Sequence, residues 1–305
     1  MTAPAPSQTT LGALLAAAEQ QLGAADLAFG HGTTNAHDEA AWLVLWSLGL
    51  PLDADLNDPA WANRPLTPAQ QTQTARLLQA RIGQRKPAAY LTRQAWLQGV
   101  PFYVDERAII PRSLVAETLA SGSIDAWLGR QPRRVLDLCT GNGSLAVLAA
   151  LAWPGAQIDA ADISMDALAV ARINLDQHHL HQRIRLLQSD SLAACPGPYD
   201  LILCNPPYVN TQSMTALPPE YRAEPELALA GGADGMDFIR PLLAAVHAHL
   251  ADGGALVLEI GHERPNFEAA FPHLNPIWLD TSAGGDQVLL LARDMLAVCT
   301  AERPA

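Results

Sequence analysis

The residues at 205–208, Asn-Pro-Pro-Tyr, offer the groups needed to hold a planar nitrogen. The apolar run 199–204 predicts a buried strand, which must end at Asn205 because Pro206 has no N–H to donate to a sheet. A residue before proline is held extended, so the Asn205 side chain and the Pro206 carbonyl keep a nearly fixed relation. Both would lie at the carboxyl end of the strand, where open α/β sheets bind ligands.

Two acceptors at this place favour chemistry at an amide or exocyclic amine nitrogen. Such a nitrogen attacks an electrophile only after its delocalised lone pair is turned out of conjugation. The oxygens of Asn205 and Pro206 would accept its two N–H groups, and the Tyr208 ring would pack on its flat face, with no strong base required. The alternative is an ordinary turn, because Asn-Pro and Pro-Pro are turn signals.

A glycine-rich turn earlier in the chain predicts a cofactor site. The run 134–138 predicts a strand, and residues 140–146 form a glycine turn that enters a helix. Glycines let a ligand approach the backbone, and the helix start offers free N–H groups. Asp162 follows Gly141 by 21 residues, at the tip of the next strand, where a carboxylate can take both hydroxyls of a ribose.

The same turn leaves two cofactor classes open. Gly141-x-Gly143-x-x-Ala146 also satisfies the dinucleotide fingerprint, which is a weak motif by itself. Asp137, just ahead of the turn, would repel a pyrophosphate but can pair with the cationic amino-acid moiety of S-adenosylmethionine. The plainer alternative is that Asp137 and Asp162 only cap helices. A third strand ends at Asp190, so three consecutive strands finish in an acid.

Composition limits the remaining choices. The chain has 305 residues, 49% of them hydrophobic, which indicates a folded protein of one large or two ordinary domains. A net charge of -12 argues against a phosphate-gripping surface and suits a basic partner. Without a signal sequence or a long apolar run, we expect a soluble, cytoplasmic protein. No C-x-x-C pair occurs, so neither zinc nor disulfides are indicated, and we expect no metal, with reduced thiols at Cys139, Cys195, Cys204 and Cys299.

The chain divides into a helical part and an α/β part. We assign no chemistry to His31 and His37 of the helical part, since such a pair is more often structural. The predicted divisions are a disordered tail at 1–10, a helical domain at 11–84, a hairpin connector at 85–112 and an α/β domain at 113–305. In the connector, runs at 95–104 and 108–110 flank an Asp-Glu-Arg turn, and a helix is expected from 113 to 129.

Strands and helices alternate in the α/β domain, which predicts a largely parallel sheet covered by helices on both faces. Seven strands are expected, the last antiparallel, at 134–138, 157–161, 184–189, 199–204, 255–260, 275–280 and 286–291. The loop 209–234 is too long for a bare connection and is expected to cover a substrate.

Together, the residues at 135–143, Asp162 and the run 205–208 resemble the seven-stranded, Rossmann-like class I methyltransferases that use S-adenosylmethionine to modify a planar nitrogen. Nearly the whole chain resembles the protein-glutamine N5-methyltransferases, in which a small helical domain is joined by a hairpin to the catalytic domain. The resemblance implies S-adenosylmethionine as the cofactor, transfer to a glutamine side chain, and substrate recognition by the helical domain.

Two branches of that family differ in substrate. One methylates the Gly-Gly-Gln glutamine of peptide chain release factors, and the other a glutamine of a large-subunit ribosomal protein of the uL3 type. The release-factor branch usually has Pro-Arg-Pro where this chain has Pro111-Arg112-Ser113. Similarity to the ribosomal-protein branch is carried by that run and by the runs 29–40, 103–107 and 220–227. We favour the ribosomal-protein branch.

The resemblance implies roles by position. Asn205, Pro206 and Tyr208 would be catalytic, and Pro207 would join them in binding the substrate. The cofactor would contact Asp137, Cys139, Thr140, Gly141, Asn142, Gly143, Asp162, Ile163, Asp190, Ser191 and Asn205. Ser191 departs from the family, which often has a bulky residue there against the adenine, so we expect the adenine pocket of this chain to be filled differently.

Functions of other classes remain as alternatives. An adenine-N6 nucleic-acid methyltransferase could use the same Asn-Pro-Pro-Tyr run, but the chain has no basic stripe and we expect no sequence-specific nucleic-acid binding. A nicotinamide oxidoreductase is disfavoured by Asp137 and leaves Asn205 without a role. A binding module with a decayed site would be expected to have lost Asp162 or Asn205.

Overall fold

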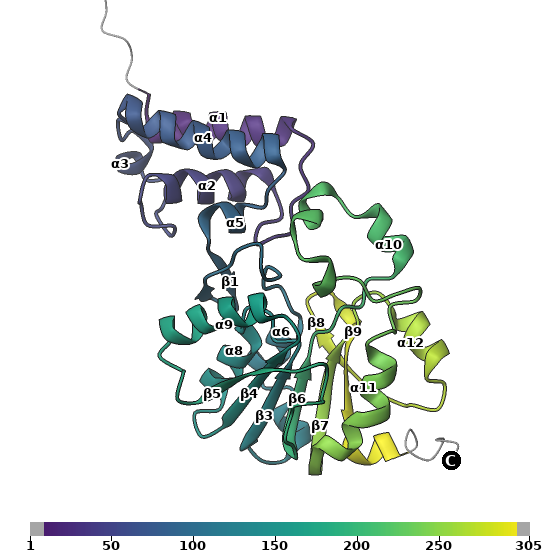
Figure 1. Cartoon of the computed structure of the whole chain (residues 1–305). Coiled ribbons are helices and arrows are strands. Elements are labelled where there is room, and N and C mark those ends of the chain that lie inside the picture. Colours follow the sequence, from purple (N-terminus) through teal and green to yellow (C-terminus); the bar gives the residue numbers. More distant parts are fainter. Residues whose placement is uncertain (1–8, 298–305) are drawn as a thin grey trace, which may run out of the picture. The chain divides into compact units, whose positions relative to one another are not determined.

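The computed structural model describes residues 9–297, which form two compact units (Figure 1). The first unit comprises the chain up to Arg93 together with Pro218–Ala223, and the second comprises the rest. Residues 1–8 of the expected tail lie outside the described residues, as does Cys299. The expected tail is two residues too long, because Thr9 accepts a backbone hydrogen bond from Leu66 at 2.9 Å and Thr10 caps the first helix.

The first unit is helical, and its helices begin where the sequence offers caps. Asn35 accepts a hydrogen bond from the Asp38 N–H. Thr67 and Gln70 form a capping box, and the residue after Thr67 is a proline at the start of the helix. These side chains satisfy N–H groups that the first turn leaves without partners. The helices of the unit are α1 (Leu11–Ala24), α2 (Ala36–Ser47), α3 (Pro59–Ala62), α4 (Pro68–Gln84) and α5 (Ala88–Thr92).

The second unit holds a seven-stranded sheet with the order β5-β4-β3-β6-β7-β9-β8. Only β9 runs against its neighbours, so the expectation of seven strands with the last one antiparallel is confirmed. The strands are β3 (Arg134–Leu138), β4 (Gln157–Asp162), β5 (Ile184–Gln188), β6 (Tyr199–Cys204), β7 (Leu250–Glu259), β8 (Ile277–Thr281) and β9 (Gly284–Ala292).

Helices cover both faces of this sheet, as the alternation of strands and helices predicts (Figure 1). Val135 and Leu201 face a core shared with α6 (Val115–Ala120) and α8 (Ser144–Ala152). Leu136 and Ile202, one residue further along each strand, face the opposite core, which α11 (Ile239–Ala245) and α12 (Arg264–Ala270) close. The remaining helical segments are α7 (Asp125–Leu128), α9 (Met165–Gln177), η3 (Val246–His249) and η4 (Arg293–Leu296).

The connector differs from its prediction. The hairpin pairs β1 (Ala95–Leu97) with β2 (Val100–Phe102) around Gln98 and Gly99, not around the Asp-Glu-Arg turn. Gln98 and Gly99 both have positive φ, as a two-residue hairpin turn requires. Asp105 instead accepts the N–H of Arg107 and closes a local turn outside the hairpin.

The prediction of one helix over 113–129 is also wrong. Two short helices, α6 and α7, take its place, separated at Gly122, whose φ is +70°. The hydroxyls of Ser121 and Ser123 both donate to the Thr118 carbonyl there, which offers the backbone an alternative to helix continuation.

The long segment after Asn-Pro-Pro-Tyr has short helices of its own, α10 (Thr211–Ala216), η1 (Pro219–Ala223) and η2 (Glu226–Ala228). Its part Pro218–Ala223 belongs to the first unit, whereas the residues before and after it belong to the second.

Candidate active site

The carboxyl ends of four parallel strands bring the predicted site residues to one edge of the sheet. Leu138 of β3 pairs with Ala161 of β4 and with Cys204 of β6, and Cys204 pairs in turn with Leu258 of β7. The glycine turn, Asp162 and Asn205 therefore leave the sheet at the same level. This edge of an open α/β sheet is where ligands bind.

Contacts between neighbouring strands shape the glycine turn. The Thr140 N–H donates to the Ala161 carbonyl at 3.0 Å, and the Gly141 N–H donates to the Asp162 carboxylate at 2.9 Å. Gly143 has φ +82°, and a Cβ there would lie 3.2 Å from the Ala171 Cβ on helix α9. Glycine at this position therefore allows both the left-handed turn and the close approach of α9.

Two buried polar atoms in this turn lack a partner among the described residues. One is Oδ1 of Asp137, whose Oδ2 accepts the Thr140 hydroxyl at 2.5 Å and the Ala146 N–H at 2.9 Å. The other is Nδ2 of Asn142. Burial raises the pKa of Asp137 to about 7. A buried carboxylate oxygen without a partner fits a cationic group, so these residues suit the ammonium of S-adenosylmethionine.

Asp162 lies at the end of β4 with both carboxylate oxygens in use by backbone groups. Oδ2 accepts the Gly141 N–H, and Oδ1 accepts the Ser164 N–H at 2.9 Å. Burial raises its pKa. Each carboxylate oxygen can accept a further hydrogen bond, so the ribose role predicted for Asp162 stays open to it. Ile163 beside it is 48% exposed, which leaves an apolar face for a planar ring.

The third strand places Asp190 and Ser191 two and three residues beyond the end of β5. Asp190 is exposed. Ser191 has φ +48°, and its carbonyl accepts the Ser189 hydroxyl at 2.7 Å. A positive φ is uncommon for a residue with a Cβ, so this turn is held by its contacts and not by local preference. Their predicted adenine contacts remain predictions.

Asn205 and Pro206 keep their acceptors available. Asn205 is half-buried, and within residues 9–297 its side chain has no hydrogen-bond partner. The Pro206 carbonyl accepts no hydrogen bond from these residues either, although Pro206 itself is buried. Two acceptors beside the glycine turn are the arrangement that the sequence predicts for holding an –NH₂ group.

Tyr208 is fixed at its hydroxyl. The phenol donates to Oε1 of Glu259 at 3.0 Å. Burial and the Glu259 charge both raise the pKa of Tyr208 well above its usual value. The hydroxyl therefore does not serve as a base at neutral pH, which agrees with the prediction that the ring, and not the hydroxyl, contacts the substrate.

Two buried residues that form hydrogen bonds with predicted site residues were missed in the sequence. Glu259 is 3% exposed at the end of β7, and its acid after an apolar strand is the signal that could have revealed it. Asn174 is fully buried on α9, and its amide donates to the Tyr103 carbonyl at 2.9 Å and to the Asn142 carbonyl at 2.8 Å. A polar residue on the apolar side of a helix is the corresponding signal.

The sequence runs typical of the ribosomal-protein branch form hydrogen bonds with one another or within the same run. Arg112 binds the buried Glu224 carboxylate with two hydrogen bonds of 2.7 Å, and the same carboxylate accepts the Ile110 N–H. Asp105 accepts hydrogen bonds from Tyr103 and Arg107, and chiefly the Arg107 bond lowers the pKa of Asp105 to about 2. Paired forks of this kind fix loops in one geometry.

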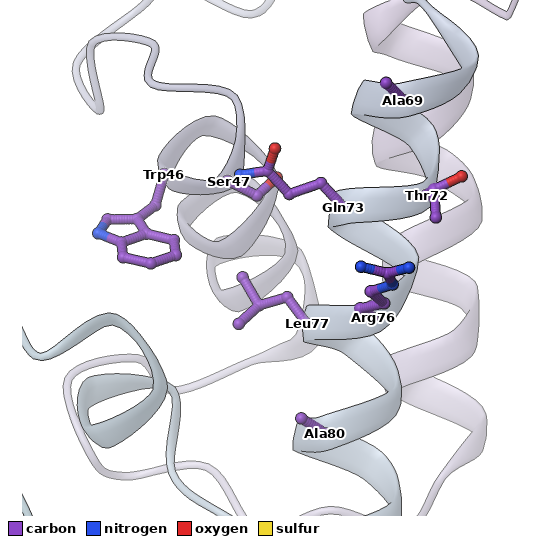
Figure 2. Close-up of a pocket in the computed structure, with 8 residues that line it drawn as sticks. All are labelled: Trp46, Ser47, Ala69, Thr72, Gln73, Arg76, Leu77 and Ala80. Carbon is purple, nitrogen blue, oxygen red and sulfur yellow. The ribbon is translucent and has the colours of Figure 1, made fainter.

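A groove of about 670 Å³ lies in the first unit, between the end of α2 and helix α4 (Figure 2). Trp46 and Leu77 point toward each other across it, and Gln73 and Arg76 border it from α4. None of the predicted cofactor or catalytic residues lines it. Those that do are Trp46, Ser47, Ala69, Thr72, Gln73, Arg76, Leu77 and Ala80.

Across residues 9–297 no helix is long and apolar enough to cross a membrane. In the same residues no three side chains of the types His, Cys, Asp or Glu gather as metal ligands. Cys139, Cys195 and Cys204 are free thiols, and the neighbouring Cys204 together with burial raises the pKa of Cys139 well above its usual value.

Known proteins resemble the chain at two levels. A family model described as the methyltransferase small domain matches residues 118–217, which contain every predicted cofactor and catalytic residue. Among solved structures, the hMettl16 catalytic domain in complex with MAT2A 3'UTR hairpin 6 has a TM-score of 0.51 and 13% identity, covering 74% of this chain and 81% of that one. At this identity the likeness supports the fold alone.

Curated relatives are similar over almost their full length. The ribosomal protein uL3 glutamine methyltransferase of Bordetella pertussis is 53% identical over 94% of this chain and 96% of its own. The protein of the same name from Burkholderia pseudomallei is 48% identical over 95% and 96% of the two chains. That of Neisseria meningitidis serogroup B is 47% identical over 94% of each. On these grounds the chain belongs to the family of ribosomal protein uL3 glutamine methyltransferases.

Proposed function

We propose that this enzyme transfers a methyl group from S-adenosylmethionine to the side-chain amide nitrogen of a glutamine in ribosomal protein uL3. The observation that carries the proposal is the pair of available acceptors on Asn205 and Pro206, beside a glycine turn with a buried, unpartnered carboxylate oxygen on Asp137. Family membership supports both the reaction and the substrate.

The chain's own residues orient the amide. Asn205 Oδ1 and the Pro206 carbonyl would each accept one N–H of the target –NH₂, which turns the nitrogen lone pair away from the amide plane. Tyr208 supplies an apolar ring beside them, with its hydroxyl held by Glu259. Because these groups are fixed before the substrate arrives, the amide meets an arrangement that needs little reorganisation.

S-adenosylmethionine, when bound, supplies a methyl group activated by a sulfonium. Asp137 would hold its ammonium, and Asp162 would take the ribose hydroxyls. Ile163 offers the exposed apolar surface for the adenine. Asp190 and Ser191 would border the same ring.

The decisive experiment compares acceptors. The purified chain, incubated with S-adenosylmethionine labelled in its methyl group, is expected to label uL3 and to leave a release factor unlabelled. A uL3 variant with asparagine at the labelled glutamine serves as the control. Label on the release factor alone would move the enzyme to the other branch, and label on nucleic acid alone would favour the adenine alternative.

A variant of Asp162 tests the cofactor site. Asp162→Ala is expected to weaken S-adenosylmethionine binding by about 2 kcal/mol, roughly 30-fold, because charge-assisted hydrogen bonds to the ribose are lost. Asp166→Ala, an exposed acid in the first turn of the following helix, is the matched control and should bind normally. Calorimetry measures both, and an unchanged affinity in Asp162→Ala would remove the ribose role.

The first unit, we propose further, recognises the protein substrate. It holds none of the predicted cofactor or catalytic residues, and it contains a groove with an aromatic anchor, Trp46. Trp46→Ala is expected to raise KM for uL3 about tenfold and to leave cofactor affinity unchanged, as loss of an interface aromatic does. Trp61→Ala, in the same unit but outside the groove, is the control. Equal KM values for the two variants would contradict a role for the groove.

The location of the enzyme belongs to the same proposal. A ribosomal-protein substrate suits a cytoplasmic enzyme without sequence-specific nucleic-acid binding. Cell fractionation and a binding assay with duplex DNA test these two points.

A further inference from the structure

The carboxylate of Glu259 has no part in holding the methyl donor or the amide, yet it lies at the level of the catalytic turn. Cys204 of β6 pairs with Leu258 of β7, so Asn205 and Glu259 are the next residues of two adjacent parallel strands. Glu259 is 3% exposed, and its burial raises its pKa. A buried carboxylate is kept only where donors compensate for the loss of water.

Four donors surround this carboxylate, and they come from two distant parts of the sequence. Oε2 accepts the Ser113 hydroxyl at 2.6 Å and the Leu114 N–H at 2.9 Å, with the Val115 N–H further away at 3.4 Å. Oε1 is left for one partner, the Tyr208 hydroxyl at 3.0 Å. The first three donors thus fix the direction in which Oε1 points, and Oε1 fixes the phenol.

Glycine backbone closes around Tyr208 on its other sides. A Cβ on Gly261 would lie 2.5 Å from the Tyr208 ring, one on Gly231 would lie 2.7 Å from its Cα, and one on Gly235 would lie 2.4 Å from its carbonyl oxygen. No side chain fits in these three places. Gly261 therefore packs directly against the ring, and Gly231 and Gly235 pack against the main chain of Tyr208. The hydrogen bond to Glu259 is the only polar restraint on the ring among the described residues.

We infer that Glu259 and Ser113 are positioning residues for the methyl transfer, acting through Tyr208. Ser113 orients the Glu259 carboxylate, and the carboxylate holds the Tyr208 hydroxyl. This hydrogen bond fixes the position of the Tyr208 ring within the turn that also contains Asn205 and Pro206. The inference rests on the proposed function, because it assigns these residues to the presentation of the target amide. Neither residue is among those proposed to hold the cofactor or the target amide, so the effect should fall on kcat and on protein-substrate KM and not on cofactor affinity.

A double-mutant cycle between Ser113 and Tyr208 tests this. Ser113→Ala is expected to lower kcat/KM about tenfold, the size of a lost hydrogen bond to a charged group, with S-adenosylmethionine affinity unchanged. Ser113→Thr, which keeps a hydroxyl, should restore most of the activity. Tyr208→Phe should cost a similar factor, and adding Ser113→Ala to it should cost less than a further twofold. Residues that act through the same series of contacts show such non-additivity, whereas the fold-losses of independent residues multiply.

The cycle is measured on whichever protein the wild-type enzyme labels, uL3 or the release factor. An enzyme that labels only the release factor would therefore overturn the uL3 assignment and still allow the cycle to be scored. Multiplying losses, or a Ser113→Ala variant with wild-type kcat/KM, would overturn the positioning role.

Should Ser113→Ala fail to fold, Glu259→Gln takes its place. Glutamine has the same shape as glutamate, and its side-chain amide can still form a hydrogen bond with the Tyr208 hydroxyl. It has only one acceptor oxygen, so one of the two acceptor positions of the carboxylate is lost. The same lack of further loss in the Tyr208→Phe background is expected. A full additional loss there would equally overturn the inference.

Discussion

Changing Asn205 to alanine should lower the rate of methyl transfer by roughly 100-fold or more, equivalent to about 2.7 kcal/mol of transition-state stabilisation. The Asn205 side chain holds no other described residue, so its loss removes an acceptor for the substrate without breaking a contact of the fold. The remaining Pro206 carbonyl cannot turn the nitrogen lone pair alone, because a single hydrogen bond leaves the amide free to rotate.

Single-turnover kinetics at saturating S-adenosylmethionine measure this rate directly. Gln212→Ala provides a matched control, since it removes an exposed side-chain amide from the segment that follows the same turn. Melting temperature and cofactor affinity should stay near wild type in both variants. A near-normal single-turnover rate for Asn205→Ala would show that Asn-Pro-Pro-Tyr is only a turn.

Local sequence patterns predicted the sheet well because the residues that end a strand can be recognised in the sequence. Two prolines stop β6 at Cys204, and an acid followed by a glycine turn stops β3 at Leu138. The last strand is antiparallel because the connection between β8 and β9, Ser282 and Ala283, is too short for a crossover. Short apolar segments were harder. The connector hairpin turns at Gln98 and Gly99 because positive φ at both suits the strand twist, whereas the sequence shows a glycine there at only one position.

The residues that hold the site in place could not be predicted in the same way. Ser113 and Glu259 are 146 positions apart, and no local periodicity relates them. In the sequence Ser113 is only a marker of one branch of the family, and its hydrogen bond to Glu259 appears only in three dimensions. Glu220 is similar, because it lies in a segment expected to cover the substrate and yet binds Arg81 of the first unit, 139 positions away.

The guanidinium of Arg81 is 1% exposed and binds two carboxylates of the first unit. Its Nε donates to Glu39 at 2.6 Å, its Nη1 donates to Glu220 at 3.2 Å, and its Nη2 donates to the Ala28 carbonyl at 2.9 Å. The side chains of Glu39 and Glu220 are 3% and 0% exposed. Arg85 adds a second cation to Glu220. Burial opposes ionisation of Glu220, but the hydrogen bonds from the two arginines lower its pKa below the usual value.

Replacing Arg81 by methionine should therefore destabilise the protein by about 3 to 5 kcal/mol, the cost of leaving buried charge without its partner. The methionine keeps an apolar stem in place of the arginine stem but vacates the space of the guanidinium, so the loss combines unpaired charge with a smaller packing loss. Urea unfolding measures the effect as a lower transition midpoint. Arg76→Met, an exposed arginine on the same helix, is the control and should lie within about 0.5 kcal/mol of wild type.

Neutralising the carboxylates separates the charge effect from packing. If unpaired charge causes the loss, adding Glu39→Gln and Glu220→Gln to Arg81→Met should recover a large part of it, since neutral amides cost less to bury than carboxylates. The paired Glu220 has a lowered pKa, so its contribution to wild-type stability is present above the usual glutamate pKa of about 4.5 and is lost as the pH falls below it. An Arg81→Met midpoint equal to that of Arg76→Met would mean that this buried cluster adds nothing to the stability of the first unit.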